Sequence, residues 1–297
     1  MTVPNAATPS ALLASLLAQL PAAISATIST STRGGYLYEA YLFGVVLRAS
    51  RLAGFSVAFE DRDGVASVLR LRGAPGRLPI PGDPGMRWTH AVLSCPERPA
   101  LEVHTAVSVV GKSKVVHEAD VLMLPQVDAE RCRNFDLDPR GSDAELTIEA
   151  KYYTDAVGLG EGREFLGLSS DVNARNKMFV ATLAGNSVVS LFAGQRPVVQ
   201  YDIGVLPGRN GEASLLGIVQ RVLRNYRSSR RLARCIRPPV RTNAGAPETS
   251  LLARYAGTSF AGCWRALRRR RRRRLAARTL GKSPAARGWR PAWCSSA

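Results

Sequence analysis

Two short apolar stretches carry the residues that decide the fold: VVHEADVLML at residues 115–124 and LTIEAK at residues 146–151. Both are rich in Val, Leu and Ile, which is typical of strands. Asp120 interrupts the first stretch, and Glu149 and Lys151 lie at the end of the second. Two carboxylates and a lysine at neighbouring strand ends can hold a divalent metal ion and prepare a water molecule. The pattern therefore indicates chemistry at a phosphodiester bond.

The segments around these stretches predict an antiparallel hairpin and one further strand. Residues 101–110 alternate well enough for a strand, and residues 111–114, GKSK, predict a turn. The stretch 115–124 is then the partner strand of this hairpin. Residues 145–153 predict the next strand. A helix over about residues 36–53, followed by a glycine that ends it, precedes the hairpin.

The remaining segments before residue 227 differ in clarity. Residues 60–100 contain prolines that break any regular pattern, so they predict an insertion or an edge strand, and the polar residues 126–144 predict a loop. A glycine-rich turn precedes a helix that we expect to begin near Arg163. The other expected elements are strands over residues 55–59, 177–183 and 198–206, and helices over residues 10–20, 187–193 and 214–226.

The net charge of +18 comes from the C-terminal part of the chain. Residues 1–226 carry 22 Lys+Arg and 22 Asp+Glu, whereas residues 227–297 carry 19 Lys+Arg and one acidic residue. The part with apolar periodicity is therefore electrically balanced. Any basic nucleic-acid surface on it must be a local patch rather than a global field.

These patterns divide the chain into three parts. We expect an N-terminal helix and linker over residues 1–32, a globular domain over residues 33–226 and an arginine-rich tail over residues 227–297. The tail holds the run Arg268–Arg274 and no lasting apolar period, so it cannot bury enough surface to fold. Two interpretations of it stay open: a disordered basic tail, or the out-of-frame translation of a GC-rich gene.

The cysteines and the apolar runs suggest a location in the cell. Cys95 and Cys132 are the two cysteines before residue 227, and they lack the paired spacing of a disulfide framework or a zinc site. We therefore expect a reducing cytoplasm. The sequence has no signal-peptide pattern and no apolar run of about 18 residues, so we expect no membrane span.

The order of helix, strand, hairpin, Glu-x-Lys strand, helix and strand resembles the PD-(D/E)xK nuclease superfamily. The matching residues are Asp120, Glu149 and Lys151, with Glu39 in the first helix. The similarity covers roughly residues 33–206, and its opening helix begins with RGGYLYE and ends before Gly-Phe. An alanine precedes Asp120 where the motif's name has proline, but many members lack that proline. The resemblance implies a three-layer α/β core of restriction-endonuclease-like fold, with a central mixed sheet flanked by helices.

The function implied by this resemblance is a Mg²⁺-dependent DNA endonuclease, in restriction or defence. Asp120 and Glu149, with the Ala150 carbonyl, would bind Mg²⁺ or Mn²⁺. Lys151 would orient the attacking water or help to deprotonate it, and Glu39 would join the site directly or through water. The expected partner is DNA; whether the protein also needs a second copy or another subunit stays open.

Each assignment has a structural alternative. Glu149 and Lys151 point to one side of a strand and could form only a solvent-facing ion pair. Glu39 lies in a helix that is apolar nearly all round, so its carboxylate needs a partner, which could be Arg48 or a tyrosine hydroxyl instead of a metal. Glu102 is a spare carboxylate that could point into the same cleft.

Two basic residues are weaker candidates for contact with a substrate phosphate. His117 lies beside the site in sequence, although it fits an ordinary sheet residue equally well. Arg163 could grip a phosphate together with helix N–H groups, or pair with Glu161 or Glu164. At the level of the whole protein, the alternatives are a non-catalytic nuclease-like DNA-binding or scaffold protein, and a protein that binds nucleic acid or membrane surfaces through its basic tail.

Overall fold

The computed structural model describes residues 8–80, 83, 85–96, 98–195 and 200–229. The chain divides into two units, Met1–Ile236 and Arg237–Ala297. The second unit, which includes Arg268–Arg274, lies outside the described residues. Of the expected tail, residues 227–297, only residues 227–229 are described. Among the helices within the described ranges, none combines the length and apolar character needed to cross a lipid bilayer.

The first unit is built on an eight-stranded sheet with the order β10-β9-β8-β7-β6-β5-β2-β3. Strands β8, β9 and β10 pair in parallel, and the others pair antiparallel, so the sheet is mixed. A two-stranded parallel pair, β1 (Ser25–Ala26) and β4 (Val68–Leu69), lies outside it. The strands of the large sheet are β2 (Ser56–Asp61), β3 (Gly64–Val65), β5 (His90–Cys95), β6 (Arg98–Val110), β7 (Val116–Pro125), β8 (Leu146–Lys151), β9 (Lys177–Ala181) and β10 (Gln200–Ile203).

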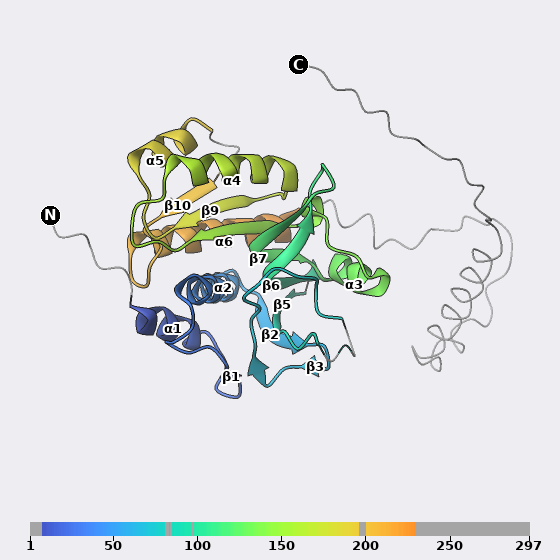
Figure 1. The fold of residues 1–297 in the computed structure, drawn as a ribbon. Helices are drawn as coiled ribbons and strands as arrows, with labels where there is room; N and C mark the ends of the chain where they lie inside the picture. The colour runs from blue at the N-terminus through green and yellow to red at the C-terminus, as the bar shows by residue number, and fades with distance from the viewer. Residues whose placement is uncertain (1–7, 81–82, 84, 97, 196–199, 230–297) are drawn as a thin grey trace, which may run out of the picture. The chain divides into compact units, whose positions relative to one another are not determined.

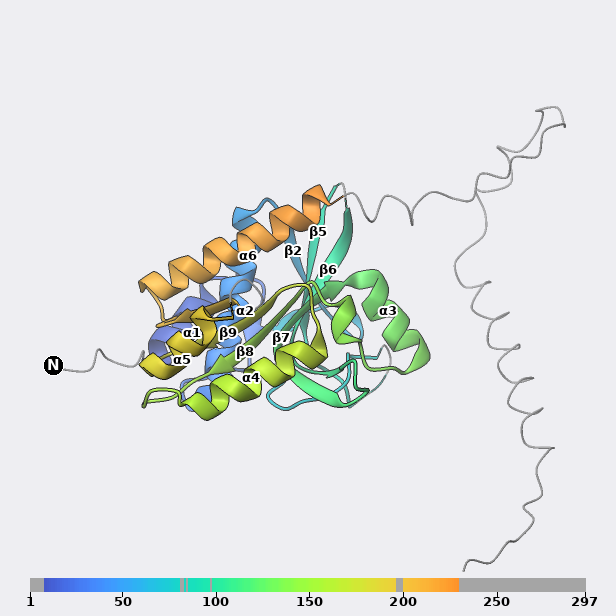
Figure 2. The same cartoon turned by 90° about the horizontal axis from the view of Figure 1, so that it is seen from above.

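Helices cover both faces of this sheet (Figures 1 and 2). The helices are α1 (Pro9–Leu17), α2 (Gly34–Leu52), α3 (Gln126–Phe135), α4 (Leu159–Val172), α5 (Asn186–Ala193) and α6 (Asn210–Ser228). Helices α1, α2 and α6 share one hydrophobic cluster with the sheet, and α3, α4 and α5 pack through two others on the opposite face. The expectation of an α/β fold with a central mixed sheet flanked by helices is confirmed.

Three segments differ from the sequence-based expectation. Helix α3 and a 3-10 turn (Gly141–Asp143) occupy the segment expected to be a polar loop. Helix α3 buries only Ala129 and Cys132, so its sequence has no apolar period. Strand β5 was missed because most of its side chains are buried and it does not alternate. Helix α4 begins four residues before Arg163, with Gly158 as its N-cap.

The N-terminal segment packs on the rest of the unit through α1. Leu12 and Leu16 of α1 are fully buried in the same cluster as α2. A side chain at Gly44 of α2 would lie 3.3 Å from the Leu16 backbone, so the glycine permits the close approach of the two helices. Helix α2 is thereby buried on most of its surface, as its apolar sequence predicts.

The segment between β4 and β5 extends the sheet beside β6. At Ala106 the backbone of β6 adopts a positive φ of 48°. Beyond Ala106, Gly76 lies along the edge of β6 that does not pair with β7. The Gly76 N–H donates to the Ala106 carbonyl at 3.2 Å, and the Gly76 carbonyl accepts from the Ser108 N–H at 2.9 Å. The Arg72 N–H donates to the Thr105 hydroxyl. The segment 70–89, called the insertion below, is thus bonded to the sheet at Arg72 and Gly76.

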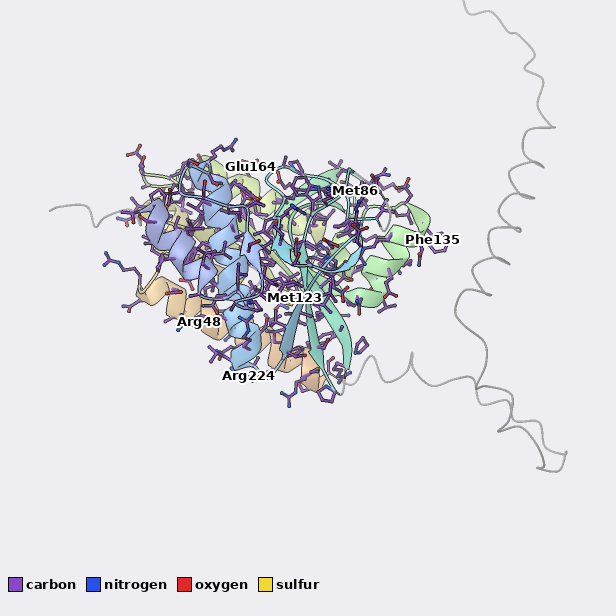
Figure 3. All side chains as sticks on the ribbon, turned by 90° about the horizontal axis from the view of Figure 1, so that it is seen from below. Arg48, Met86, Met123, Phe135, Glu164 and Arg224 are labelled. Carbon is purple, nitrogen blue, oxygen red and sulfur yellow. The ribbon has the colours of Figure 1, made fainter. Side chains whose placement is uncertain are left out.

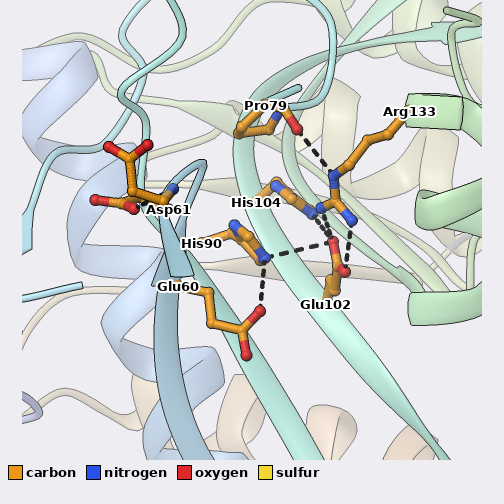
Figure 4. A network of polar contacts seen from close by, with 8 residues as sticks. Glu60, Asp61, Pro79, His90, Glu102, His104 and Arg133 are labelled. Carbon is orange, nitrogen blue, oxygen red and sulfur yellow. Dashed lines mark hydrogen bonds and ion pairs between the residues drawn. The ribbon is translucent and has the colours of Figure 1, made fainter. Parts of the chain in front are cut away.

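A buried polar network holds α3 and the insertion on β6 (Figure 4). Glu102 is fully buried and accepts a two-pronged hydrogen bond from the Arg133 guanidinium of α3 and a 2.8 Å bond from His104. Arg133 also donates to the Pro79 carbonyl at 2.9 Å. Burial raises the pKa of Glu102, but the bonds from His104 and Arg133 outweigh it and bring that pKa to about 2. Glu102 is therefore a paired buried anion.

His90 is the least satisfied member of this network. Its ring stacks on His104 with centroids 4.7 Å apart, and its Nε2 lies 3.6 Å from Glu102 and 4.0 Å from Glu60. Neither ring nitrogen of His90 has a hydrogen-bond partner. Burial, with the neighbouring His104, lowers the pKa of His90 to about 3. His90 is therefore neutral at physiological pH.

Replacing Glu102 by glutamine should destabilise the protein by ~3–5 kcal/mol, because it leaves the Arg133 guanidinium without an anion. The matched change Glu60→Gln should cost less than ~1 kcal/mol, because the Glu60 side chain is 37% exposed and lies 4.0 Å from its nearest basic partner. Urea denaturation at neutral pH measures both. Equal, small losses in the two variants would show that the network does not hold α3 in place.

Candidate active site

The candidate site lies where β7 and β8 separate. Their paired residues end at Val121 opposite Ile148. Past that point β7 stays paired with β6, and β8 stays paired with β9 as far as Lys151. We call this point the fork. Asp120 is the first residue past it on β7, and Glu149 is the first past it on β8. The register of the two strands therefore places the two sequence motifs next to each other at the fork.

Asp120 replaces the missing strand partner at the fork. Its Oδ2 accepts the Ala150 N–H at 2.6 Å, so the side chain satisfies a backbone donor. The carboxyl is 9% exposed. Burial raises the pKa of Asp120 well above its ordinary value, the charges of Glu149 and Glu39 raise it further, and the Ala150 bond opposes them only in part. Asp120 is thus a buried acid among other acids.

Glu149 and Lys151 form an ion pair on β8, with 2.7 Å between Lys151 Nζ and Glu149 Oε1. The pair is not a plainly solvated one, because the two side chains are 16% and 21% exposed. Burial acts to lower the pKa of Lys151, but the adjacent Glu149 carboxylate outweighs it and raises that pKa. Lys151 is therefore a cation at neutral pH. It can orient a water molecule and offset negative charge, but it is a poor proton acceptor in this state.

Glu39 reaches the fork from α2, on the face of the sheet that this helix covers. Burial raises its pKa to about 7, and the carboxylates of Glu118 and Glu149 act in the same direction, while Arg33 and Lys151 oppose them. The suggested pair between Glu39 and Arg48 does not form, because Arg48 lies 3.4 Å from Glu212 instead. The structure thus brings Glu39 within electrostatic reach of both motifs.

Glu118 is a member of this group that the sequence analysis did not single out. Burial and the Glu149 charge raise its pKa, with Lys151 opposing, and Glu118 is the largest charge effect on Glu39. Its position two residues before Asp120, on the same strand, was the available signal. Glu118 and Glu149 also line a crevice of about 10 Å³ against α4, roughly the space that one water molecule needs.

The structure places three other candidates away from the fork. Glu102 belongs to the network with Arg133 and does not contribute a spare carboxylate. His117 binds Asp171 at the end of α4, with 2.7 Å between its Nε2 and Oδ2, and Asp171 also accepts from Ser113 in the hairpin turn. His117 therefore fastens the hairpin to α4, as an ordinary sheet residue would. The sequence suggestion that it contacts substrate beside the site is not supported.

Arg163 does not sit at the N-terminus of its helix. Because α4 begins at Leu159, the acidic residue in its first turn is Glu161. Arg163 lies in the second turn of the helix. The Arg163 side chain is exposed. The free helix N–H groups belong to the turn before Arg163, and contact of Arg163 with a substrate phosphate stays a prediction.

The donor chemistry at the fork suits a hard divalent cation. Four carboxylates, Glu39, Glu118, Asp120 and Glu149, interact electrostatically and face one lysine, Lys151. Oxygen donors of this kind favour Mg²⁺ or Mn²⁺. Within the described ranges, no group of three His, Cys, Asp or Glu side chains is arranged to hold a metal ion as it stands. Asp120 instead accepts the Ala150 N–H, and Glu149 pairs with Lys151.

Replacing Glu39 by glutamine should stabilise the folded protein at about pH 8 and change it little at about pH 5. The folded pKa of about 7 exceeds the ordinary value of 4.5, so stability from this group is present at low pH and is lost as the pH rises through that window. The gain at the higher pH should be ~2 kcal/mol, less than the full shift implies because the side chain is partly exposed.

Urea denaturation of both forms at the two pH values measures this effect. The exposed Glu164 of α4 (Figure 3) supplies the control, since Glu164→Gln should change stability equally little at both. A Glu39→Gln variant whose stability follows the wild-type pH profile would mean that Glu39 titrates normally.

The chain matches no family model, no curated protein and no solved structure.

Proposed function

We propose that the protein is a metal-dependent endonuclease that hydrolyses DNA phosphodiester bonds in restriction or defence, on a core of restriction-endonuclease-like fold. The support is the meeting of Asp120 with Glu149 and Lys151 at one fork, and the approach of Glu39 from α2. These are the residues through which the sequence resembles the PD-(D/E)xK superfamily. A mixed sheet with helices on both faces suits this proposal as well.

One observation supports the proposal most: burial raises the pKa of Glu39, Glu118 and Asp120, and neighbouring carboxylates raise it further. A folded protein that concentrates buried negative charge pays for it in stability unless a cation binds there. Perturbed pKa values of this kind cluster at functional sites. Lys151 offsets one of the negative charges, which leaves a binding site for a divalent ion as the explanation of the rest.

Each residue has a part in the proposed reaction. Asp120 and Glu149, with the Ala150 carbonyl, would hold Mg²⁺ or Mn²⁺, and Glu39 would join them directly or through water. When bound, the ion supplies a more acidic water and offsets charge on the attacked phosphate. Lys151 orients the water and neutralises charge on the phosphate, as its raised pKa favours. The Ala150 N–H keeps the Asp120 carboxylate fixed at the fork.

Replacing Asp120 by asparagine should weaken Mn²⁺ binding by at least ~tenfold and abolish metal-dependent cleavage. The asparagine carbonyl can still accept the Ala150 N–H, so the fold should be kept. DNA binding without metal should stay equal or become tighter, because one negative charge facing phosphate is removed. Calorimetry with Mn²⁺ and an electrophoretic shift with DNA in EDTA measure the two effects.

The control is Asp136→Asn, a change at a surface carboxylate that is 61% exposed and paired with Arg77; it should leave Mn²⁺ affinity unaltered. Unchanged Mn²⁺ affinity in the Asp120 variant would remove Asp120 from the ligands. A wild-type protein that binds DNA but shows no Mn²⁺ effect would instead be the non-catalytic scaffold.

Replacing Lys151 by alanine should lower the cleavage rate at least ~100-fold, and it should lower the melting temperature while the protein stays folded. The lysine charge acts directly on the reacting phosphate, and the lysine is also the partner of Glu149, which would otherwise be a partly buried carboxylate without a cation. Lys112→Ala, in the exposed hairpin turn, is the matched control and should cleave normally. Wild-type rates in the Lys151 variant would exclude this lysine from the mechanism.

A further inference from the structure

The insertion carries an excess of basic residues. Residues 70–89 contain Arg70, Arg72, Arg77 and Arg87 and one acidic residue, Asp83. Arg77 is paired with Asp136 and Asp138, so the excess comes from Arg70, Arg72 and Arg87. The Asp83 carboxylate accepts the Gly85 N–H at 2.8 Å, which engages it within its own turn.

A hollow of about 570 Å³ lies within the insertion, in the size range of sites for small organic ligands. Its lining combines Arg72 and Asp83 with the apolar surfaces of Pro75, Met86 and Trp88. Figure 3 labels Met86, one of these lining residues. An aromatic ring and an arginine beside apolar side chains form the combination that stacks on a nucleobase and attracts its phosphate.

The key pair in the hollow is held in place before any ligand arrives. The Arg72 guanidinium lies 5.5 Å from the centroid of the Trp88 ring, a cation–π distance. The same guanidinium donates to the Arg77 carbonyl. The Arg72 backbone N–H donates to the Thr105 hydroxyl of β6, and the Arg72 carbonyl accepts from the same hydroxyl. Arg72 is thus fixed to the sheet with its guanidinium over the Trp88 ring, so little side-chain entropy of Arg72 is lost on binding.

The hollow is connected to the fork through the first turn of α2. Tyr36 donates its hydroxyl to the Leu71 carbonyl, and a side chain at Gly73, which lines the hollow, would lie 3.1 Å from the Tyr36 ring. Burial and the charge of Glu39 raise the pKa of Tyr36 to about 12. Tyr36 therefore touches the wall of the hollow and lies within electrostatic reach of a fork carboxylate.

We propose that this hollow binds one unpaired nucleotide of the DNA strand that enters the fork, with its base against Trp88 and its phosphate near Arg72. The inference rests on the proposed function, because it places the nucleotide beside the scissile bond of a nuclease substrate. A base inside a duplex presents only its edges, so a ring that stacks on a base face selects single-stranded or frayed DNA.

Binding in EDTA tests the hollow without requiring catalysis. The full-length protein is titrated into short fluorescent oligothymidylate and into the corresponding duplex, at low and at raised salt. Trp88→Leu should weaken binding to the single strand ~10-fold, since one stacked base contributes ~1–3 kcal/mol. Trp88→Phe should retain most of the affinity because it keeps a π-face. The loss should persist at raised salt, where contacts of charged residues with phosphate are weakened.

The control makes the same aromatic-to-leucine change elsewhere. Phe135 is 67% exposed at the end of α3 (Figure 3) and does not line the hollow, so Phe135→Leu should leave affinity unchanged. An oligonucleotide containing 2-aminopurine should lose its stacking-dependent fluorescence change in Trp88→Leu. Thermal unfolding verifies that each variant is folded, and oligouridylate and thymidine monophosphate distinguish a DNA strand from RNA or a free nucleotide.

Two outcomes would overturn the inference: wild-type affinity in Trp88→Leu, or equal loss in Trp88→Leu and Trp88→Phe. Preference for duplex over single strand would overturn it as well. The proposed function fails separately, if wild-type protein shows no Asp120-dependent Mn²⁺ binding or cleavage. Trp88-dependent oligonucleotide binding without cleavage would keep the hollow as a nucleotide site on a non-catalytic protein.

Discussion

The hydrogen bond from the Ala150 N–H to the Asp120 carboxylate is the contact on which the site depends. Two strands that separate inside a sheet leave backbone donors without partners, and a buried unpaired donor is costly. Asp120 supplies the missing acceptor from its side chain. The strands can therefore part at this point, and the same bond fixes a carboxylate where the motif on β8 begins.

The separation of the strands also determines the electrostatics. Once Asp120 is held at the fork, Glu149 follows on the other strand, Glu118 lies two residues away on β7, and Glu39 approaches from α2. Burial raises the pKa of Glu39, Glu118 and Asp120, and repulsion from neighbouring carboxylates raises it further. Lys151 counters one of them. The remaining imbalance is the physical reason for proposing a divalent cation.

A second polar centre positions the insertion. Glu102 joins β6 to α3 through Arg133, and Arg133 reaches the Pro79 carbonyl at the edge of the insertion. The insertion in turn carries Arg72 and Trp88 and touches Tyr36 at the start of α2. The buried network and the fork are therefore linked through β6, β7 and α2, which are rigid elements. A nucleotide bound in the hollow would meet a surface whose position relative to the fork is fixed by the core.

Local patterns were sufficient to predict the elements that frame the site. Residues 101–124 form the expected antiparallel hairpin because their apolar alternation and the GKSK turn are encoded within a single segment. Helix α2 was predicted from its composition, since a helix that is apolar nearly all round must be buried. The four residues Glu39, Asp120, Glu149 and Lys151 were named from motif spacing, and the structure brings them together.

Only the tertiary structure decided which polar side chains pair with one another. Glu102 meets Arg133 and His117 meets Asp171 across 31 and 54 positions of the chain, and no local period specifies such partners. Helix α3 was missed because it buries only two small side chains and so shows no apolar period. Strand β5 was missed because most of its side chains are buried and it does not alternate. The sequence determined the elements, whose signals are local; packing between distant segments determined the partners, because burial and charge pairing depend on neighbours that the chain brings together only when it folds.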